Sequence, residues 1–443
     1  KAMPHISWPM RFILPLDESQ RFETSTPVSK LLNKIFPFYK NRRPAWLIRA
    51  GLLLYDLMGG RTILPGASKL DLSDSVEGEP LKKKYRKAYE YSDCWVEDSR
   101  LVILNAKDAA TLGAKIHVNT KVISANSENG LWRIETKNLA TNEREVFLSK
   151  VLINAGGPWV SDLLLNILRI NSSEKVRLVR GSHIVVLKMW SHEKSYFFQG
   201  DDGRIIFAIP YETGFTLLGT TDIDHLDVNE EPKCTDLEKN YLINSANQYF
   251  KSELKVEDIV WTYSGVRPLQ DTSEDNATAV TRDYSIKVNQ KDGVPLINVF
   301  GGKITTYRKL AESVMDEVDL FIPKIRGPWT DKAHLPGGDF SVGGSPKLIS
   351  DLLTAFPFLN VKWAMRLVKA YGTEAFEMLG SVCNEEELGI NFGATLTQKE
   401  VEWLIKKEFA TSAEDILWRR SKLGLRLNEF QVKTLQDWIA NQN

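Results

Sequence analysis

The sequence contains few cysteines, and none of them forms a recognisable pair. Only three occur among 443 residues, Cys94, Cys234 and Cys383, and no CxxC spacing exists. An odd number of widely separated cysteines argues against a disulfide framework and against a zinc site built on thiolates. We therefore expect a protein of a reducing compartment, the cytoplasm.

Net charge and long apolar runs are also missing. The 57 Lys and Arg residues balance 57 Asp and Glu residues, so no overall field attracts a nucleic acid, and we expect no such partner. No uninterrupted apolar run reaches about 18 residues, the length of a membrane-spanning helix. The first residues do not show the charged-then-apolar pattern of a signal peptide. The sequence therefore predicts no membrane span.

One segment, residues 42–61, combines an apolar stripe with basic flanks and is interrupted by Arg49 and Asp56. This pattern suits a helix lying on a membrane surface. Packing of the helix against its own protein is the favoured interpretation, because most amphipathic helices of soluble proteins pack in this way.

The glycines lack the spacing GxGxxG that usually marks a dinucleotide site. They occur instead as pairs, at residues 59–60, 156–157, 301–302, 337–338 and 343–344. The pair Gly156-Gly157 follows an almost fully apolar strand and precedes a helical pattern, which is where cofactors approach the backbone of an α/β sheet. A tight turn that needs small residues is the alternative.

Periodicity predicts a mixed α/β protein of two or three domains. Residues 59–74 are expected to form an irregular loop, and residues 98–112 a helix. Alternation around Asn129-Gly130 predicts a hairpin within a β-meander. A second β-rich block, residues 176–299, predicts one antiparallel sheet, to which "PLINVF" (295–300) is assigned. The Gly-rich residues 335–347 are expected to be a linker, and the patterns that follow predict a C-terminal all-helical domain.

Four residues that follow strands at glycine or proline turns are candidates for chemistry: His183, Arg267, Arg282 and Lys303. Three cations and one imidazole suit a small dianion such as a phosphate ester, with one group left to move a proton. The structural alternatives are a hydrogen-bonded histidine at a strand start, and ion pairs of the arginines with acidic residues close by in sequence, namely Asp271, Asp275 and Asp283.

Lys303 is the hardest of the four to explain structurally. The glycines Gly301 and Gly302 before it make a poor helix start unless the backbone must approach another molecule, and free N–H groups there attract an anion. A metal site is not expected, because Asp222 and Asp224 are too isolated to supply several oxygen ligands.

Nine motifs in register over almost the whole chain resemble the FAD-dependent glycerol-3-phosphate dehydrogenases. They are "PMRFILP", "EYSDCWVEDSRLV", "NAGGPWV", "RLVRGSHIVV", "IPYETGFTLLGTTD", "WTYSGVRPL", "TRDY", "FGGKITTYRKLAE" and "LWRRSKLG". The resemblance implies an FAD-binding domain of the glutathione-reductase type, an antiparallel substrate-cap sheet and a C-terminal helical domain. We expect the first two within residues 1–335, with the cap mainly in 1–95 and 176–295, and the helical domain in 336–443.

The implied reaction is oxidation of sn-glycerol 3-phosphate to dihydroxyacetone phosphate, with electrons passing from FAD to quinone or O2. In this sequence the resemblance makes His183 the base, Arg267 and Arg282 the substrate clamp, and Lys303 the group that stabilises negative charge on the reduced flavin. It assigns further cofactor contacts to Val122, Ala155, Gly156, Gly157, Trp159, Gly301, Gly302, Ile304 and Thr305. A membrane surface on the inner face of the cell membrane and a second copy of the chain are further candidate partners.

The sequence departs from the family at its beginning. Members of the family start with a strand, a GxGxxG turn and a helix that hold the FAD diphosphate, whereas this sequence opens at Lys1 inside the family pattern. We expect an N-terminal segment to be missing and the FAD site of these residues to be incomplete. The favoured interpretation is part of a working flavoenzyme, and the alternative is a non-catalytic remnant that binds a phosphate ligand or a partner.

Overall fold

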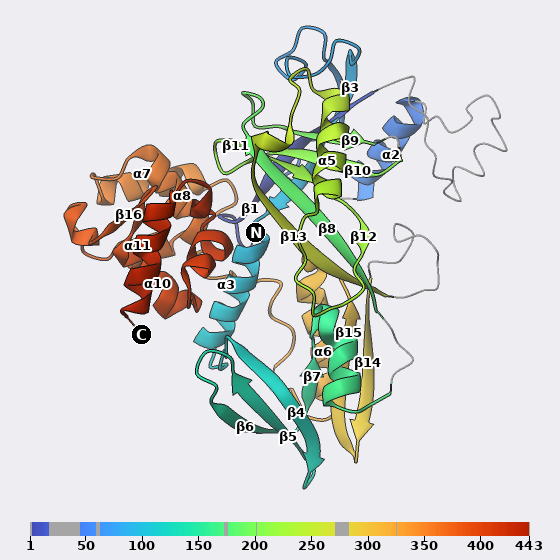
Figure 1. Ribbon diagram of the computed structural model, residues 1–443, viewed down its shortest axis with the longest axis vertical. Helices are drawn as coiled ribbons and strands as arrows, with labels where there is room; N and C mark the ends of the chain where they lie inside the picture. Colours follow the sequence, from blue (N-terminus) through green and yellow to red (C-terminus); the bar gives the residue numbers. More distant parts are fainter. Residues whose placement is uncertain are drawn as a thin grey trace, which may run out of the picture.

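The computed structural model describes residues 2–16, 45–58, 63–171, 176–200, 202–270, 283–324 and 326–442. Within them the chain is a mixed α/β protein with a helical C-terminal part. Figure 1 shows a large twisted sheet at the top, a smaller sheet with a β-meander below it, and the C-terminal helices to one side. Helix α3 (Asp98–Thr111) runs between the C-terminal helices and the sheets.

In the described residues the large sheet has the strand order β12-β8-β11-β10-β9-β1-β3-β2. Strand β13, which is outside this order, also pairs with β8. The pairs of this sheet are antiparallel except for β1 with β9. Helix α5 (Asp236–Tyr249) covers one face, where Ile184 and Val186 of β8 pack with Leu242 of the helix. The strands are β1 (Ser7–Pro15), β2 (Ser68–Asp71), β3 (Lys87–Val96), β8 (Val176–Leu187), β9 (Ser195–Gln199), β10 (Ile205–Tyr211), β11 (Phe215–Gly219), β12 (Ile223–Asp224) and β13 (Ile259–Gln270).

The smaller sheet has the order β14-β15-β7, with β15 parallel to β7. The prediction that residues 295–300 belong to the large antiparallel sheet is therefore wrong, since β15 pairs with β7 and β14. The predicted meander is confirmed as β4-β5-β6, with Asn129 and Gly130 at positive φ in its first turn. These elements are β4 (Thr120–Glu128), β5 (Leu131–Asn138), β6 (Arg144–Ser149), β7 (Leu152–Asn154), β14 (Tyr284–Lys291), β15 (Val294–Gly301) and α6 (Tyr307–Asp319).

The C-terminal part forms its own apolar core around Trp363, Leu367, Leu404 and Leu435. The predicted helices are present, but a short ribbon of β16 and β17 and the additional helix α9 were not predicted. The domain is thus helical without being all-helical. Its elements are α7 (Ser345–Ala355), α8 (Val361–Tyr371), α9 (Glu374–Leu379), β16 (Asn391–Gly393), β17 (Leu396–Thr397), α10 (Gln398–Glu408), the π-helical η7 (Asp415–Arg420) and α11 (Glu429–Ala440).

Two segments predicted to be irregular are more ordered than expected. The predicted loop at 59–74 contains β2, which pairs with β3; residues 59–62 of this prediction lie outside the described residues. The predicted linker is packed against the protein, because the Leu335 side chain is buried, its N–H donates to the carbonyl of Ala2, and the N–H of Thr373 donates to the carbonyl of Gly337. Glycine is needed at position 337, where φ is +76° and a Cβ would lie 2.0 Å from the carbonyl oxygen of Tyr371.

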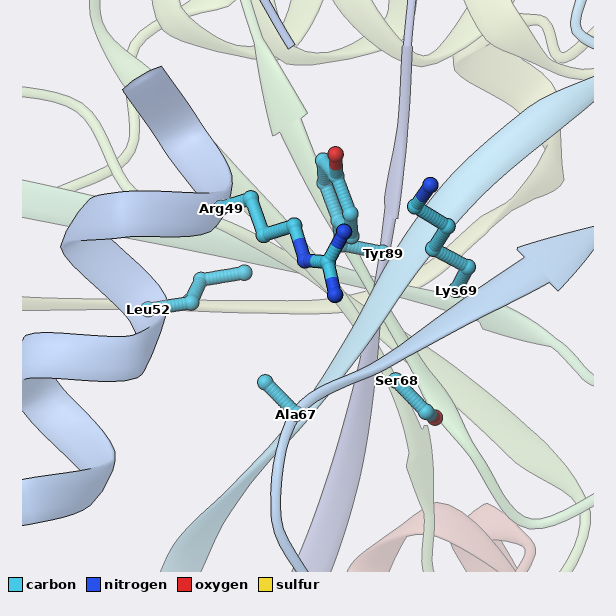
Figure 2. A pocket seen from close by; sticks show the side chains of 6 residues that line it. All are labelled: Arg49, Leu52, Ala67, Ser68, Lys69 and Tyr89. Atoms are coloured by element: carbon cyan, nitrogen blue, oxygen red, sulfur yellow. The ribbon is translucent and has the colours of Figure 1, made fainter. Parts of the chain in front are cut away.

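Helix α2 (Ala45–Met58) corresponds to the apolar stripe with basic flanks. Self-packing was the favoured interpretation, but Trp46, Leu53, Leu54 and Leu57 are each more than half exposed. Figure 2 shows that Arg49 and Leu52 of the helix line a small cavity together with Ala67, Ser68, Lys69 and Tyr89. No helix among the described residues is long and apolar enough to cross a membrane.

Candidate functional site

Three strands of the large sheet position His183. In β8 it lies opposite Gly219 of β11 and opposite Tyr263 of β13. The imidazole stacks on the Tyr263 ring, with 4.8 Å between ring centroids and 7° between the planes. A Cβ at Gly219 would lie 2.0 Å from Cδ2 of His183. The glycine is therefore needed for the imidazole to lie against the sheet.

The surroundings of His183 keep its imidazole neutral. Burial and, second, the positive charge of Arg267 lower its pKa from 6.5 to about 4. Its Nδ1 is buried and has no hydrogen-bond partner among the residues described. A neutral imidazole can accept a proton at pH 7, which a protonated one cannot.

Arg267 is held by the segment that follows β11. Its Nη1 lies 2.5 Å from Oδ1 of Asp222, and its Nη2 donates to Oγ1 of Thr220 at 3.0 Å. A Cβ at Gly181 would lie 2.5 Å from Nη2, so this glycine leaves room for the guanidinium. The arginine side chain is still 31% exposed, which leaves donors accessible to a small anion.

The acidic partner of Arg267 was not predicted. Asp222 had been considered only as a metal ligand, and in the described residues no cluster suited to a metal exists. Of the acidic residues given as alternative ion-pair partners, Asp271 and Asp275 lie outside the described residues, as does Arg282, whereas Asp283 is described just before β14. The motif "GTTD" (219–222) contained the available signal, a carboxylate and a hydroxyl two residues apart after a buried strand.

The two glycine pairs with predicted cofactor roles lie at the same edge of the smaller sheet. Strands β7 and β15 run parallel, with Asn154 opposite Asn298, so the turns that follow both strands emerge together. The buried Asn154 fixes this arrangement, because its Nδ2 donates to Oδ1 of Asn298 at 3.1 Å and its Oδ1 accepts from the N–H of Gly156. Carboxyl ends of parallel strands are where α/β proteins bind ligands.

The glycines of these turns adopt backbone conformations that favour glycine, and one of them, Gly157, borders open space. Gly157, Gly301 and Gly302 have positive φ, and a Cβ at Gly157 would meet no atom within 4 Å. Beside them Trp159 is 49% exposed and Ile304 42% exposed, so two apolar side chains are accessible at these turns. A flat, partly apolar group fits this combination.

Lys303 stands at the start of the helical segment that leads into α6. It is exposed, no side chain caps the N–H groups of this segment, and within the described residues its ammonium has no ion-pair partner. Uncapped N–H groups and a free cation favour an anion here. Ala155 and Thr305 are exposed in the same two turns, whereas Val122 is half-buried in β4.

The part of the candidate site that contains His183 and Arg267 adjoins the part formed by the glycine turns at β13. A Cβ at Gly301 would lie 3.6 Å from the carbonyl oxygen of Pro268, the residue after Arg267. The short 3-10 helix η2 (Gly157–Trp159) also contacts β13 and β15. The glycine turns thus lie beside the strand that carries Arg267, although no hydrogen bond or ion pair in the described part of the chain joins Lys303 to His183 or Arg267.

Comparison with known proteins identifies two family models along the chain. Residues 4–306 match the FAD dependent oxidoreductase family, and residues 328–439 match the C-terminal domain of alpha-glycerophosphate oxidase. The D-erythritol 1-phosphate dehydrogenase of Brucella abortus is 42% identical over 442 residues, which cover 100% of this chain and 84% of that protein. The aerobic glycerol-3-phosphate dehydrogenase of Escherichia coli is 37% identical and covers 99% of this chain and 83% of its own length.

A solved structure has a similar fold. The glycerol-3-phosphate dehydrogenase of Bacillus halodurans, determined in complex with FAD, superposes with a TM-score of 0.75 at 23% identity. The match covers 100% of this chain and 79% of that one. At this level of identity the likeness concerns the arrangement of helices and strands.

Proposed function

This chain belongs to the FAD-dependent oxidoreductase family, and we propose that it oxidises sn-glycerol 3-phosphate to dihydroxyacetone phosphate. The observation that carries the proposal is the pairing of a partly exposed guanidinium, Arg267, with a neutral imidazole, His183, on one sheet face beside the glycine turns. The names of the relatives support a phosphorylated polyol as the substrate.

Arg267 is the proposed anchor of the substrate phosphate. A guanidinium offers two parallel N–H donors to a dianion, and Asp222 with Thr220 fixes its plane. Arg282, outside the described residues, is the proposed second member of this clamp. The exposed Lys303 adds a third positive charge at the neighbouring turn.

FAD, when bound, supplies the acceptor for the hydrogen and electron pair that leave C2 of the substrate. The residues proposed to hold it are the two glycine turns, Gly156-Gly157 and Gly301-Gly302, with Trp159 and Ile304 against its apolar surface. Lys303 and the free N–H groups at its helix start are proposed to stabilise negative charge on the cofactor. Val122, Ala155 and Thr305 are proposed as further contacts.

His183 is the proposed base. The C2 hydroxyl must lose its proton as the C–H bond breaks, and a neutral imidazole beside the phosphate anchor can accept it. The stack on Tyr263 and the space left by Gly219 hold the ring in one plane, so the acceptor nitrogen has a fixed position relative to Arg267.

D-erythritol 1-phosphate is a second candidate substrate, because a relative named for its oxidation is 42% identical over the whole chain. It carries the same phosphate and an alcohol of the same kind, with a longer polyol chain. The ratio of kcat/KM for the two compounds decides between them.

The test is a flavin spectrum of the protein after incubation with excess FAD and removal of free cofactor. Anaerobic addition of glycerol 3-phosphate should bleach bound flavin, and D-erythritol 1-phosphate should be compared under the same conditions. Flavin that neither compound bleaches refutes the proposed reaction. Reoxidation by a soluble quinone analogue or by O2 then identifies the electron acceptor, and sedimentation tests the proposed homodimer.

We also propose that α2 lies on the inner surface of the cell membrane, since the helix exposes apolar side chains and carries or adjoins the cationic residues Arg49 and Lys69. Vesicles of anionic lipid should retain the protein, and Leu53→Ser with Leu57→Ser should release it. Phe430→Ser, which changes a side chain 79% exposed on α11, is the matched control and should leave binding unchanged. Equal retention of all variants contradicts the role of α2.

A further inference from the structure

A buried carboxylate lies behind the proposed substrate site. Glu238, in the first turn of α5, is 1% exposed, and five hydrogen bonds converge on it. Its Oε1 accepts from Oγ of Ser182 at 2.7 Å and from Oγ1 of Thr221 at 2.8 Å. Its Oε2 accepts from Nη2 of Arg180 at 3.0 Å and from both the N–H and the hydroxyl of Thr235.

These contacts keep Glu238 charged. Burial alone would raise its pKa, but the hydrogen bonds from Thr235, Ser182 and Thr221 outweigh burial and lower the pKa to about 2. One of the bonds, from the N–H of Thr235, belongs to the capping box of α5, and the Thr235 hydroxyl donates a second from the same residue. The other three reach strand β8 and the segment after β11, so the carboxylate does more than end a helix.

Thr221 connects this carboxylate to the substrate side of the sheet. It stands between Thr220 and Asp222, the two residues that hold the Arg267 guanidinium. Its own hydroxyl donates to Glu238 and accepts from the N–H of Ser182 at 2.9 Å. Glu238 therefore holds this segment at Thr221, the residue between the two that orient the arginine.

Hydrogen bonds through Ser182 also connect strands β8 and β13 to Glu238. Ser182 precedes His183, and its Oγ lies 2.7 Å from Oγ of Ser264, the neighbour of Tyr263 on which the imidazole stacks. Since Oγ of Ser182 gives its proton to Glu238, the hydroxyl of Ser264 is the donor in this pair. One carboxylate thus fixes the backbone beneath both Arg267 and His183.

We propose that Glu238 is a positioning residue for anionic-substrate recognition: through Thr221 it sets the orientation of Thr220 and Asp222, and so of the Arg267 guanidinium. This assignment rests on the proposed function, because it concerns the affinity of the same site for a phosphate ester. Glu238 has no direct contact with substrate in this scheme. Its loss should therefore weaken phosphate binding more than it slows the chemical step.

The variant Glu238→Gln should raise KM for glycerol 3-phosphate about tenfold, with kcat within about twofold; a tenfold change corresponds to about 1.4 kcal/mol. The amide keeps the shape but places an NH2 group against donors that need an acceptor. Thr221→Val, which removes only the linking hydroxyl, should raise KM in the same direction, and Thr221→Ser should restore it. Calorimetry with inorganic phosphate, a non-reacting probe, should show the same order of affinities.

Glu400→Gln is the matched control. Glu400 is equally buried and ion-paired, to Arg366 in the C-terminal helices, so its loss destabilises the protein without touching this segment. The proposal is supported if Glu238→Gln and Thr221→Val raise KM and weaken phosphate binding while Glu400→Gln does not. The proposal is overturned if Glu238→Gln and Thr221→Val have the same KM as Glu400→Gln. If glycerol 3-phosphate does not bleach the flavin bound to the wild-type protein, the proposed function and this assignment are both overturned. If the wild type is active, the variants test the role of Glu238 alone.

Discussion

The ion pair between Arg100 and Glu408 gives a sharp prediction about what joins the C-terminal helices to the rest of the protein. Arg100 belongs to α3 and Glu408 ends α10, and their side chains are 4% and 0% exposed. The contact is bidentate, with Nη2 of Arg100 also donating to the carbonyl of Ala370 at 2.6 Å. The perturbation is to remove either charge or both, with Arg100→Met and Glu408→Leu.

Each single variant leaves one buried charge without its partner. Removing one member of a buried pair typically costs about 3–5 kcal/mol of unfolding free energy. Arg100→Met also leaves the carbonyl of Ala370 without that donor, which adds about 1 kcal/mol. The backbone carbonyl of Glu408 keeps its hydrogen bonds from Arg420 in every variant.

The double variant should be far less damaging than the two single changes together. Both desolvated charges disappear at once, and an apolar pair of similar volume is often neutral or stabilising relative to a buried ion pair. We expect its unfolding free energy to lie within about 2 kcal/mol of wild type, against a sum of about 6–10 kcal/mol for the singles.

The assay is urea unfolding followed by tryptophan fluorescence, because Trp363 and Trp403 lie in the C-terminal core. Lys347→Met is the control, since its pair with Asp351 is largely exposed and should contribute at most about 1 kcal/mol. Single variants that cost less than the control, or a double variant as unstable as the sum of the singles, would refute the reasoning.

Two further predictions concern charge at the site and in the core. Lys303→Met should lower turnover about 100-fold, the scale of losing one charge-stabilising donor, with FAD content unchanged by absorbance; an unaltered kcat removes Lys303 from the mechanism. Burial is the main cause that lowers the pKa of His183 to about 4 and that of His5 to about 3, so the unfolded chain binds more protons than the native one below about pH 6.5. Stability should therefore fall as pH falls from 6.5 toward 4, and urea midpoints of His5→Asn with His183→Asn should lose much of that slope if the assignment is correct.

Local signals in the sequence predicted most of the helices and the meander. The turn at Asn129-Gly130 and the helical periodicities after residue 345 are specified by neighbouring residues, so they were recognised without any tertiary information. The C-terminal ribbon and α9 are short, and their sequences carry little periodicity. The division of the chain at residues 335 and 336 stays a prediction.

Sheet membership was harder, because it depends on partners far along the chain. Residues 294–301 read as a strand, but nothing within them distinguishes pairing with β7, more than 140 residues earlier, from pairing in the large sheet. The same reason hid β2, which pairs with β3 although its own four residues look irregular. Exposed apolar side chains on α2 argue against the favoured interpretation of self-packing, since the sequence shows an apolar stripe but not what covers it.

The roles of the candidate site residues stay predictions, whereas the residues that contact them in the structure were not predicted. Acidic neighbours in sequence were the alternative ion-pair partners considered for Arg267, but Asp222, which contacts it, is 45 residues away in sequence. Glu238 gave no signal beyond a helix start. Long-range contacts between polar side chains have no counterpart in periodicity or spacing, so such positioning groups become visible only in the folded protein.

His183 shows that residue type alone does not determine chemical capacity. A histidine suggests a base with a pKa near neutrality, yet burial and Arg267 lower this one to about 4, where it would be a weak base. A substrate phosphate bound to Arg267 would offset the second of these causes, since its negative charge opposes that of the guanidinium. We therefore expect the pKa of His183 to rise when the anionic substrate binds. The strength of the base would then depend on occupation of the anion site, while the imidazole of the free enzyme stays neutral and able to accept a proton.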